Sequence, residues 1–344
     1  MTQTTKNLRQ IFNETVKHQK KHDALIIPVT TINLLAYRND LDIHFPEIHT
    51  NKKDMIDLSL APYKISKIEG VNLPFDMTLE SESFGCEIDM RDESNMPEVQ
   101  KTPFKKAIDV EIPDDFTNTK RMNILYDAIC DIRSNYPDLP IVIGIVGPFT
   151  LLGQLLGIEQ LLKYIKLDYF EVEEALSVVV EALIEFIQKL ETLDIDAVVV
   201  CEPSASCDLL DPNIFNQLLK GELEYIADET TKTNTILHVC GNTTQIIEDM
   251  LTSHYDVISI ENVVSLNYVN EMRDKTKSDT LVAGNISTKT LLLGSTSDVH
   301  DEVFYALDNG IDILASSCSV PPYTPEVNVA EMVKARDEYY QTQK

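Results

Sequence analysis

Short apolar segments alternate with amphipathic stretches along most of the chain. The apolar segments are rich in β-branched residues and continuous in apolarity, which is typical of parallel strands that helices cover on both faces. Eight of them are predicted to be strands: 24–31, 71–75, 141–146, 197–203, 235–241, 256–261, 280–286 and 310–316.

The stretches between these strands carry apolar residues at helical spacing. In the longest one, Leu176, Val179 and Leu183 follow the 3.6-residue period of one helix face. Strands that alternate with helices indicate an α/β fold, and eight such units predict a (β/α)8 TIM barrel. The predicted helices are 4–20, 50–68, 121–135, 149–165, 168–193, 212–229, 243–253, 265–276, 298–309 and 325–341.

One region departs from this regular alternation. Residues 77–118 are rich in Asp, Glu and Pro, and 84–90 is predicted to be a strand or hairpin within this irregular N-terminal excursion. The rest of 1–344 is predicted to be a single barrel domain. A doubly wound sheet is the rival fold, but no Gly-x-Gly-x-x-Gly follows an early strand, which disfavours its dinucleotide-binding version.

Composition restricts the partners more than the fold. The 344 residues are 43% hydrophobic, enough for a sizeable core, and 56 acidic against 29 basic residues give a formal net charge of -27. Nucleic acid and anionic membranes attract basic surfaces, so neither is an expected partner. Residues 1–21 contain no apolar signal segment, and no apolar run reaches the roughly 18 residues of a membrane span. The expected location is therefore cytoplasmic.

Candidate metal ligands stand where strands end, which is where barrels of this class carry their chemistry. The segment 235–241 ends in His238 and Cys240, and residues two apart along a strand point to the same side. Imidazole and thiolate are ligands that zinc prefers, but a site needs three or four of them. Cys318, which also follows an apolar run, is the third candidate. The chain has six cysteines spread along its length, which favours free thiols or metal ligands over a disulfide framework.

Other polar residues share these strand ends, namely Glu202, Glu261 and Asn285. Three protein ligands would leave a fourth zinc position open, as in catalytic sites. Glu261 either completes the coordination or orients His238 through a hydrogen bond; a carboxylate that simply faces solvent is the alternative. Because Cys201 and Glu202 are neighbours on one strand, only one of them can face the barrel interior.

An open zinc site with two thiolates suits the binding of another thiol. Coordination deprotonates that thiol, and the resulting soft nucleophile is suited to accept an alkyl group. Hydrolysis by a zinc-bound water stays open as an alternative. The remaining histidines lie in polar surroundings and are predicted to be surface residues: His18, His22, His44, His49, His254 and His300.

Several of these segments carry a recognisable pattern: GPFT at 147–150, EPSAS at 202–206, HVCG at 238–241, AGNI at 283–286 and CSVPPYTP at 318–325. Together with FGCEIDM at 84–90, they resemble the uroporphyrinogen decarboxylase superfamily over nearly the whole chain. The His-x-Cys followed much later by Cys resembles one branch in particular, the methylcobamide:coenzyme M methyltransferases of methylotrophic methanogenic archaea.

This resemblance implies a function and a set of roles. His238, Cys240 and Cys318 would be zinc ligands that activate the thiol of coenzyme M, and Glu261 would hold the fourth position when the thiol is absent. The methyl group would come from a methylated corrinoid protein. Glu202, Ser204 and Asn285 are expected to line the barrel mouth that admits the corrinoid.

Three alternatives remain at this point. The decarboxylase itself would need an arginine cluster near the N-terminus, but Arg9 and Arg38 are the only arginines in the first ninety residues. A corrinoid-dependent methyltransferase with another acceptor, such as tetrahydrofolate, is the closer rival. From a different class, the chain could be a noncatalytic corrinoid- or metal-binding protein. The upstream methyl donor (methanol, methylamines or methyl sulfides) is not predicted.

Overall fold

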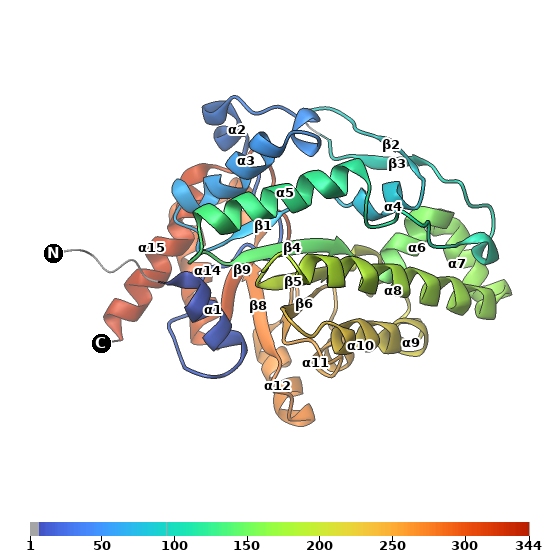
Figure 1. Cartoon of the computed structure of the whole chain (residues 1–344). Helices are drawn as coiled ribbons and strands as arrows, with labels where there is room; N and C mark the ends of the chain where they lie inside the picture. Colours follow the sequence, from blue (N-terminus) through green and yellow to red (C-terminus); the bar gives the residue numbers. More distant parts are fainter. Residues whose placement is uncertain (1–6, 94, 344) are drawn as a thin grey trace.

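The centre of the molecule is a curled sheet of seven parallel strands in the order β1-β4-β5-β6-β7-β8-β9, with helices around it (Figure 1). The computed structural model describes residues 7–343, except residue 94. The predicted α/β barrel class is confirmed. The strands are β1 (Val71–Leu73), β4 (Ile141–Val146), β5 (Ala197–Cys201), β6 (Asn234–His238), β7 (Val257–Ser259), β8 (Leu281–Ile286) and β9 (Ile313–Ser316).

The eighth position of the barrel is occupied by an irregular segment. Residues 24–31, predicted to be a strand, make a single parallel bridge from Ile26 to Leu314 of β9. On the other side, the backbone N–H of Glu69, just before β1, donates to the Ile26 carbonyl at 2.9 Å. The strand prediction is wrong because Pro28 lacks an N–H and has a fixed φ, so that a ladder cannot continue through it. The segment nevertheless lies between β9 and β1, where a strand would close the barrel.

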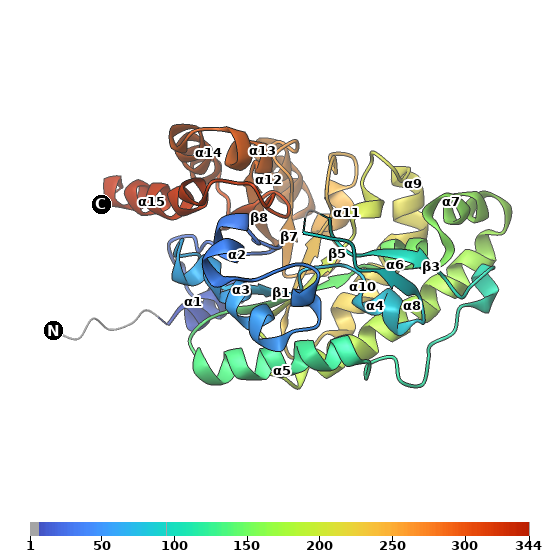
Figure 2. The ribbon, with the colours of Figure 1, turned by 90° about the horizontal axis from the view of Figure 1, so that it is seen from above.

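Helices surround the sheet, and Figure 2 shows α13, α14 and α15 gathered on one side and α6, α7 and α8 on the other. Within the described residues, no helix has the length and apolarity that crossing a bilayer requires. The helices are α1 (Leu8–Val16), α2 (Leu35–Leu41), α3 (Lys52–Lys64), α4 (Leu79–Ser83), α5 (Lys120–Asn135), α6 (Pro148–Leu156), α7 (Ile158–Leu167), α8 (Tyr169–Glu191), α9 (Pro212–Ile214), a π-helical turn (Phe215–Leu219), α10 (Lys220–Glu229), α11 (Ile247–Leu251), α12 (Leu266–Thr276), α13 (Thr288–Leu293), α14 (Thr296–Asp308) and α15 (Glu326–Thr342).

The predicted helices differ from these mainly at their ends. The helix predicted over 149–165 is two helices, α6 and α7, because Gly157 between them has a φ of +83°, which ends a right-handed helix. Helix α1 begins at Leu8, and residues 4–6 of the predicted helix lie outside the described part of the chain. Helices α2, α4 and α13 were not predicted.

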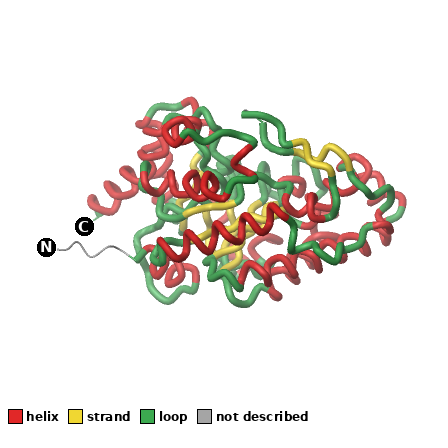
Figure 3. Tube along the Cα trace, turned by 45° about the horizontal axis from the view of Figure 1, so that its top comes forward, coloured by secondary structure: helices red, strands yellow, loops and turns green. Residues whose placement is uncertain are grey.

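The excursion over 77–118 contains a short antiparallel hairpin of β2 (Glu87–Asp89) and β3 (Glu98–Lys101). The two strands lie apart from the barrel strands (Figure 3). Phe84 anchors the region through an aromatic contact with Phe116, whose ring centroid is 4.9 Å away. The strand or hairpin predicted around 84–90 is therefore confirmed.

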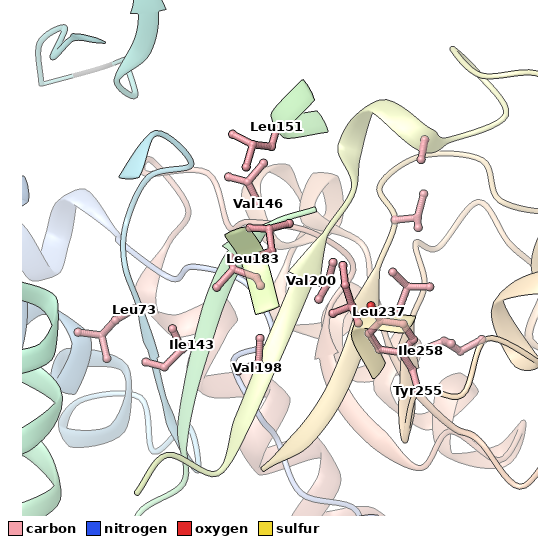
Figure 4. Packing of buried hydrophobic residues seen from close by; sticks show 14 of the residues in the cluster. Leu73, Ile143, Val146, Leu151, Leu183, Val198, Val200, Leu237, Tyr255 and Ile258 are labelled. Carbon is pink, nitrogen blue, oxygen red and sulfur yellow. The ribbon is translucent and has the colours of Figure 1, made fainter. Parts of the chain in front are cut away.

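Each strand places alternate side chains on opposite faces of the sheet. On the outer face, Val198 and Val200 of β5 pack with Leu183 of α8 and their neighbours (Figure 4). On the inner face, Val199 belongs to a second apolar cluster that also contains Phe12 and Val16 of α1. Helix α1 therefore closes the end of the barrel where the strands begin. We call this the closed end, and we call the opposite end, where the strands finish, the mouth.

Candidate metal centre

The end of β6 carries two of the predicted ligands to the mouth. His238 is in register with Cys201 of β5. Both side chains continue the inward-facing series of their strands. Immediately after Cys240 the chain turns at Gly241, whose φ is +75°. A Cβ at Gly241 would lie 2.7 Å from the Asp208 carboxylate, so the turn requires glycine.

Cys318 reaches the same place from the loop that follows β9. His238 Nε2 lies 3.1 Å from Cys240 Sγ, and Cys240 Sγ lies 3.3 Å from Cys318 Sγ. The ligand atoms of the three residues are all within 4.8 Å of one another, and no other His, Cys, Asp or Glu group of three or more in the described residues satisfies this criterion. Zinc binds sulfur at about 2.3 Å and imidazole nitrogen at about 2.0–2.1 Å, so ligand atoms spaced in this way can surround one ion. The donor set thus fits zinc.

Ser259 of β7 holds the other side of the imidazole. Its Oγ lies 3.0 Å from His238 Nδ1, and it pairs in register with His238 across the sheet. A proton on Nδ1 donated to this hydroxyl leaves the Nε2 lone pair free, which is the tautomer that metal binding needs. Sequence reasoning missed Ser259; its two-residue spacing from Glu261 and its place in the strand predicted next to β6 are the signals that could have found it.

The two thiols influence each other strongly. The hydrogen bond from Cys240 is the main cause that lowers the pKa of Cys318, and the nearby His238 lowers it further. The same hydrogen bond, followed by burial, raises the pKa of Cys240. The pair therefore carries one negative charge readily and resists a second one in the absence of a cation.

All six cysteines are free thiols, as predicted. Of the remaining four, Cys201 is in register with His238 on the neighbouring strand. Burial raises the pKa of Cys201.

Glu261, the predicted fourth ligand, is close to the cluster but bonded elsewhere. Its Oε1 accepts a hydrogen bond from the Gly241 backbone N–H at 2.7 Å. Glu261 is outside the group of three ligand atoms, and the hydrogen bond that orients His238 comes from Ser259 instead. The carboxylate thus fixes the turn after Cys240, and its direct coordination of a metal stays a prediction.

Of the neighbours Cys201 and Glu202, Cys201 faces the barrel interior and Glu202 faces away from it. The Glu202 carboxylate is fully buried. It accepts hydrogen bonds from the backbone N–H groups of Phe149 and Thr150, at 2.7 and 3.0 Å, and from the Thr150 hydroxyl at 2.7 Å. It thereby caps the N-terminus of α6. Burial raises the pKa of Glu202 to about 7, against the effect of these hydrogen bonds.

The other two predicted mouth residues differ in accessibility. Ser204 lines a pocket of about 660 Å³ together with Thr150 and the edge of β3. Asn285 lies in β8 and is 7% exposed. The structure thus brings Ser204 to an open part of the mouth and keeps Asn285 inside it.

Arg9 bears on the decarboxylase alternative, which would need arginines at the site. It forms ion pairs with Asp194 and Asp196 at the closed end, so it does not lie at the mouth. His49 is buried, with its Nδ1 2.9 Å from the Asp76 carboxylate, so its predicted surface position is wrong. Phe45 packs edge-on against its ring, and this tertiary contact was not visible in the polar local sequence.

Comparisons with known proteins identify the relatives of this chain. The family model described as uroporphyrinogen decarboxylase (URO-D) matches residues 12–339. The methylcobamide:CoM methyltransferase MtaA of Methanosarcina barkeri is 32% identical over 320 residues, which are 92% of this chain and 93% of that protein. A solved methyltransferase from Methanosarcina mazei has a TM-score of 0.92 and 31% identity, covering 97% of this chain and 99% of its own. A B12-independent methionine synthase from Shewanella has a TM-score of 0.66 and 17% identity over 94% of this chain and 99% of its own, a likeness of fold alone.

Proposed function

Since the chain belongs to the uroporphyrinogen decarboxylase family and, within it, to the branch of the methylcobamide:coenzyme M methyltransferases, we propose that it is a zinc-dependent methyltransferase of methylotrophic methanogenesis. The methyl donor would be a methylated corrinoid protein, and the acceptor would be the thiol of coenzyme M. The observation that carries the zinc part of this proposal is the meeting of His238, Cys240 and Cys318 at the mouth.

The three side chains would hold the ion through His238 Nε2 and the sulfurs of Cys240 and Cys318. Ser259 would keep the imidazole in the tautomer that binds metal. When bound, zinc would lower the pKa of a coordinated thiol and keep it deprotonated at neutral pH. Three protein ligands leave room for that thiol, as expected of a catalytic rather than a structural site.

Methyl transfer would proceed by attack of the acceptor sulfur on the methyl carbon of the corrinoid. A carbon–sulfur bond forms, the carbon–cobalt bond breaks, and its electron pair stays on the cobalt of the corrinoid. The thiol proton leaves to solvent. The reaction thus needs no oxidant or reductant, and what the protein must supply is a deprotonated sulfur at an accessible mouth.

A pocket at the strand-end side of the molecule supports a large donor. It has a volume of about 660 Å³, lies between β3 of the excursion and α6 with the start of α7, and is lined in part by Ser204 and Thr150. This volume is in the range of sites that take sizeable ligands, about 300–1,000 Å³. The corrinoid would approach the sulfur from this side.

Zinc K-edge absorption on the purified protein, with and without coenzyme M, tests the proposal directly. We expect zinc with one nitrogen and two sulfur ligands from the protein, and one additional sulfur ligand when coenzyme M is added. A parallel assay follows methyl transfer from free methylcobalamin to coenzyme M.

Different outcomes would remove different parts of the proposal. A zinc shell that ignores coenzyme M would make the acceptor wrong and would favour another acceptor such as tetrahydrofolate. Protein that takes up no zinc when it is supplied would reduce the cluster to packing. Zinc and thiol binding without methyl transfer would favour a noncatalytic binding protein.

A further inference from the structure

A pocket lies at the closed end, on the opposite side of the barrel from the candidate metal centre. It has a volume of about 590 Å³, which is within the usual range of about 300–1,000 Å³ for ligand sites. Its wall combines the loop after α1, the start of β8 at Leu281, the residues 310–312 before β9, and Tyr339 and Tyr340 of α15. The proposed function uses none of these residues.

The loop after α1 is basic, in contrast to the rest of the chain. Residues 17–22 have the sequence KHQKKH, whereas the whole chain has a formal net charge of -27. His18, Lys20, Lys21 and His22 of this loop all line the pocket. Lys20 and Lys21 are exposed, and no ion pair among the described residues involves either of them. Their ammonium groups are therefore available to an anion that enters the pocket.

The nearest carboxylates do not neutralise these two lysines. Asp312, the acidic member of the wall among the described residues, forms an ion pair with Arg273 at 3.1 Å. Glu14 of α1 lies 2.6 Å from His22 Nε2. Asp23 is exposed and does not line the pocket. The pocket thus keeps a surplus of positive charge, which favours a negatively charged ligand.

Another part of the wall is apolar and aromatic. The rings of Tyr339 and Tyr340 are edge to face, with centroids 5.3 Å apart. The Tyr339 hydroxyl donates to the Asp308 carboxylate at 3.0 Å, and the Tyr340 hydroxyl accepts at 3.0 Å from the backbone N–H of Ala24, where the irregular closing segment 24–31 begins. Both hydroxyls thus have protein partners, and the rings offer a ligand mainly apolar surface. The aliphatic side chains of the wall are Leu281, Leu307 and Ile311.

We propose that the closed-end pocket binds a nucleoside phosphate, with the phosphates at Lys20 and Lys21 and the base against the ring of Tyr339. Lysine binds phosphate as a point charge, and nucleobases stack on aromatic side chains. A simple inorganic anion would leave the aromatic wall unused, and an uncharged apolar molecule would leave the lysines unused. The inference is independent of the proposed function, because the pocket and the mouth share no residue.

The test is calorimetric binding of ADP to the full chain without divalent cations, with adenosine and pyrophosphate as partial ligands. We expect ADP to bind more tightly than either part, and its affinity to fall as salt is added, because salt screens exposed charges. Lys20→Ala combined with Lys21→Ala should weaken ADP binding by about 5- to 25-fold, since one exposed ion pair contributes up to about fivefold.

Two matched variants separate the pocket from general effects of charge and fold. Lys163→Ala combined with Lys166→Ala removes the same charge from α7, on the other side of the molecule from α15 (Figure 2), and should leave ADP binding unchanged. Tyr339→Ala should weaken ADP binding by about 5- to 100-fold and pyrophosphate binding by less than about twofold, because it removes only the stacking surface. Tyr339→Phe keeps the ring and should bind ADP as the wild type does.

Wild-type protein that binds no ADP at millimolar concentration would overturn this inference. Pyrophosphate that binds as tightly as ADP, with no effect of Tyr339→Ala, would also overturn it, because the pocket would then hold an anion only. Equal losses in the two double lysine variants would mean that overall charge, and not this pocket, attracts ADP. Each of these results would leave zinc binding and methyl transfer at the mouth as proposed.

Discussion

The two ends of the barrel are built from the same strands but from opposite kinds of side chain. At the closed end, Phe12 and Val16 of α1 enter the apolar cluster of the barrel interior. At the mouth, the inward-facing side chains two or four residues further along the strands are those of His238, Cys240 and Ser259.

Charged groups differ between the ends in the same way. At the closed end, Asp196 is bonded to both Arg9 and Arg133, and its carboxylate also accepts from the Ile141 backbone N–H at 2.8 Å. At the mouth end, the carboxylate of Glu202 is held instead by the backbone N–H groups of Phe149 and Thr150, and burial raises its pKa to about 7. Two arginines thus stabilise the charged form of Asp196, whereas burial disfavours the charged form of Glu202.

Cys318→Ala should have the largest effect, and it should be confined to the mouth. Loss of a direct ligand should weaken zinc binding by more than about 100-fold, because loss of a residue that only orients a ligand already costs up to about 100-fold. Methyl transfer from methylcobalamin should fall with it. Cys130→Ala, at an exposed thiol on α5, is the control. Zinc content and transfer rates equal to wild type in Cys318→Ala would refute the role of this cysteine.

Phe12→Ala should break the closed end and spare the mouth. The ring is fully buried, so its removal should lower the free energy of unfolding by about 3–5 kcal/mol. Zinc affinity of the folded protein should stay as in the wild type. Denaturant unfolding and zinc titration measure the two effects. Phe170→Ala, with an 80% exposed ring, should change stability by less than about 0.5 kcal/mol.

Two serines, one at the end of β7 and one before its start, sharpen the comparison further. Ser259→Ala removes the hydrogen bond to His238 Nδ1 and should weaken zinc binding by about 10- to 100-fold. Ser253→Ala, at the closed-end side, removes a buried hydroxyl that donates to the Met250 carbonyl at 2.7 Å. It should lower stability and leave zinc affinity unchanged. Equal zinc affinities in the two variants would count against the orienting role of Ser259.

The last prediction concerns the pH dependence of stability. Because the folded pKa of Glu202 is raised from 4.5 to about 7, its contribution to stability is fully present below pH 4.5 and is lost as pH rises to about 7. Glu202→Gln cannot ionise, so its unfolding free energy should gain about 2–3 kcal/mol relative to wild type between pH 4.5 and pH 8. Urea unfolding at several pH values measures this difference, and parallel curves would contradict the raised pKa.

Strand positions and the meeting of the three candidate ligands could be predicted because both depend on local sequence. Continuous β-branched runs fix the strands from β4 to β9, and the resemblance to the uroporphyrinogen decarboxylase superfamily is confirmed. The two-residue period then places His238 and Cys240 on one side. Cys318 joins them because parallel strands all finish at one end of a barrel.

What could not be predicted depends on register and on contacts across the fold. Ser259 is one serine in an apolar run, and only its pairing with His238 across two strands gives it a role. Glu202 was expected to line the mouth, but its carboxylate accepts a hydrogen bond from the first turn of α6 instead. This contact depends on α6 beginning at Pro148. The irregular path of 24–31 follows from Pro28 and from Glu69, whose side chain accepts from the Ile26 backbone N–H at 3.0 Å.

The closing segment also determines when the barrel can be completed during synthesis. Arg336 near the C-terminus donates to the carbonyl of Ala24, 312 positions earlier, and Ile26 bridges to Leu314. The closing segment therefore cannot bridge to β9 until a ribosome has delivered the chain as far as Leu314, and contacts of such sequence separation form slowly. A truncation before Leu314 would leave β8 as an open edge that can pair with other chains.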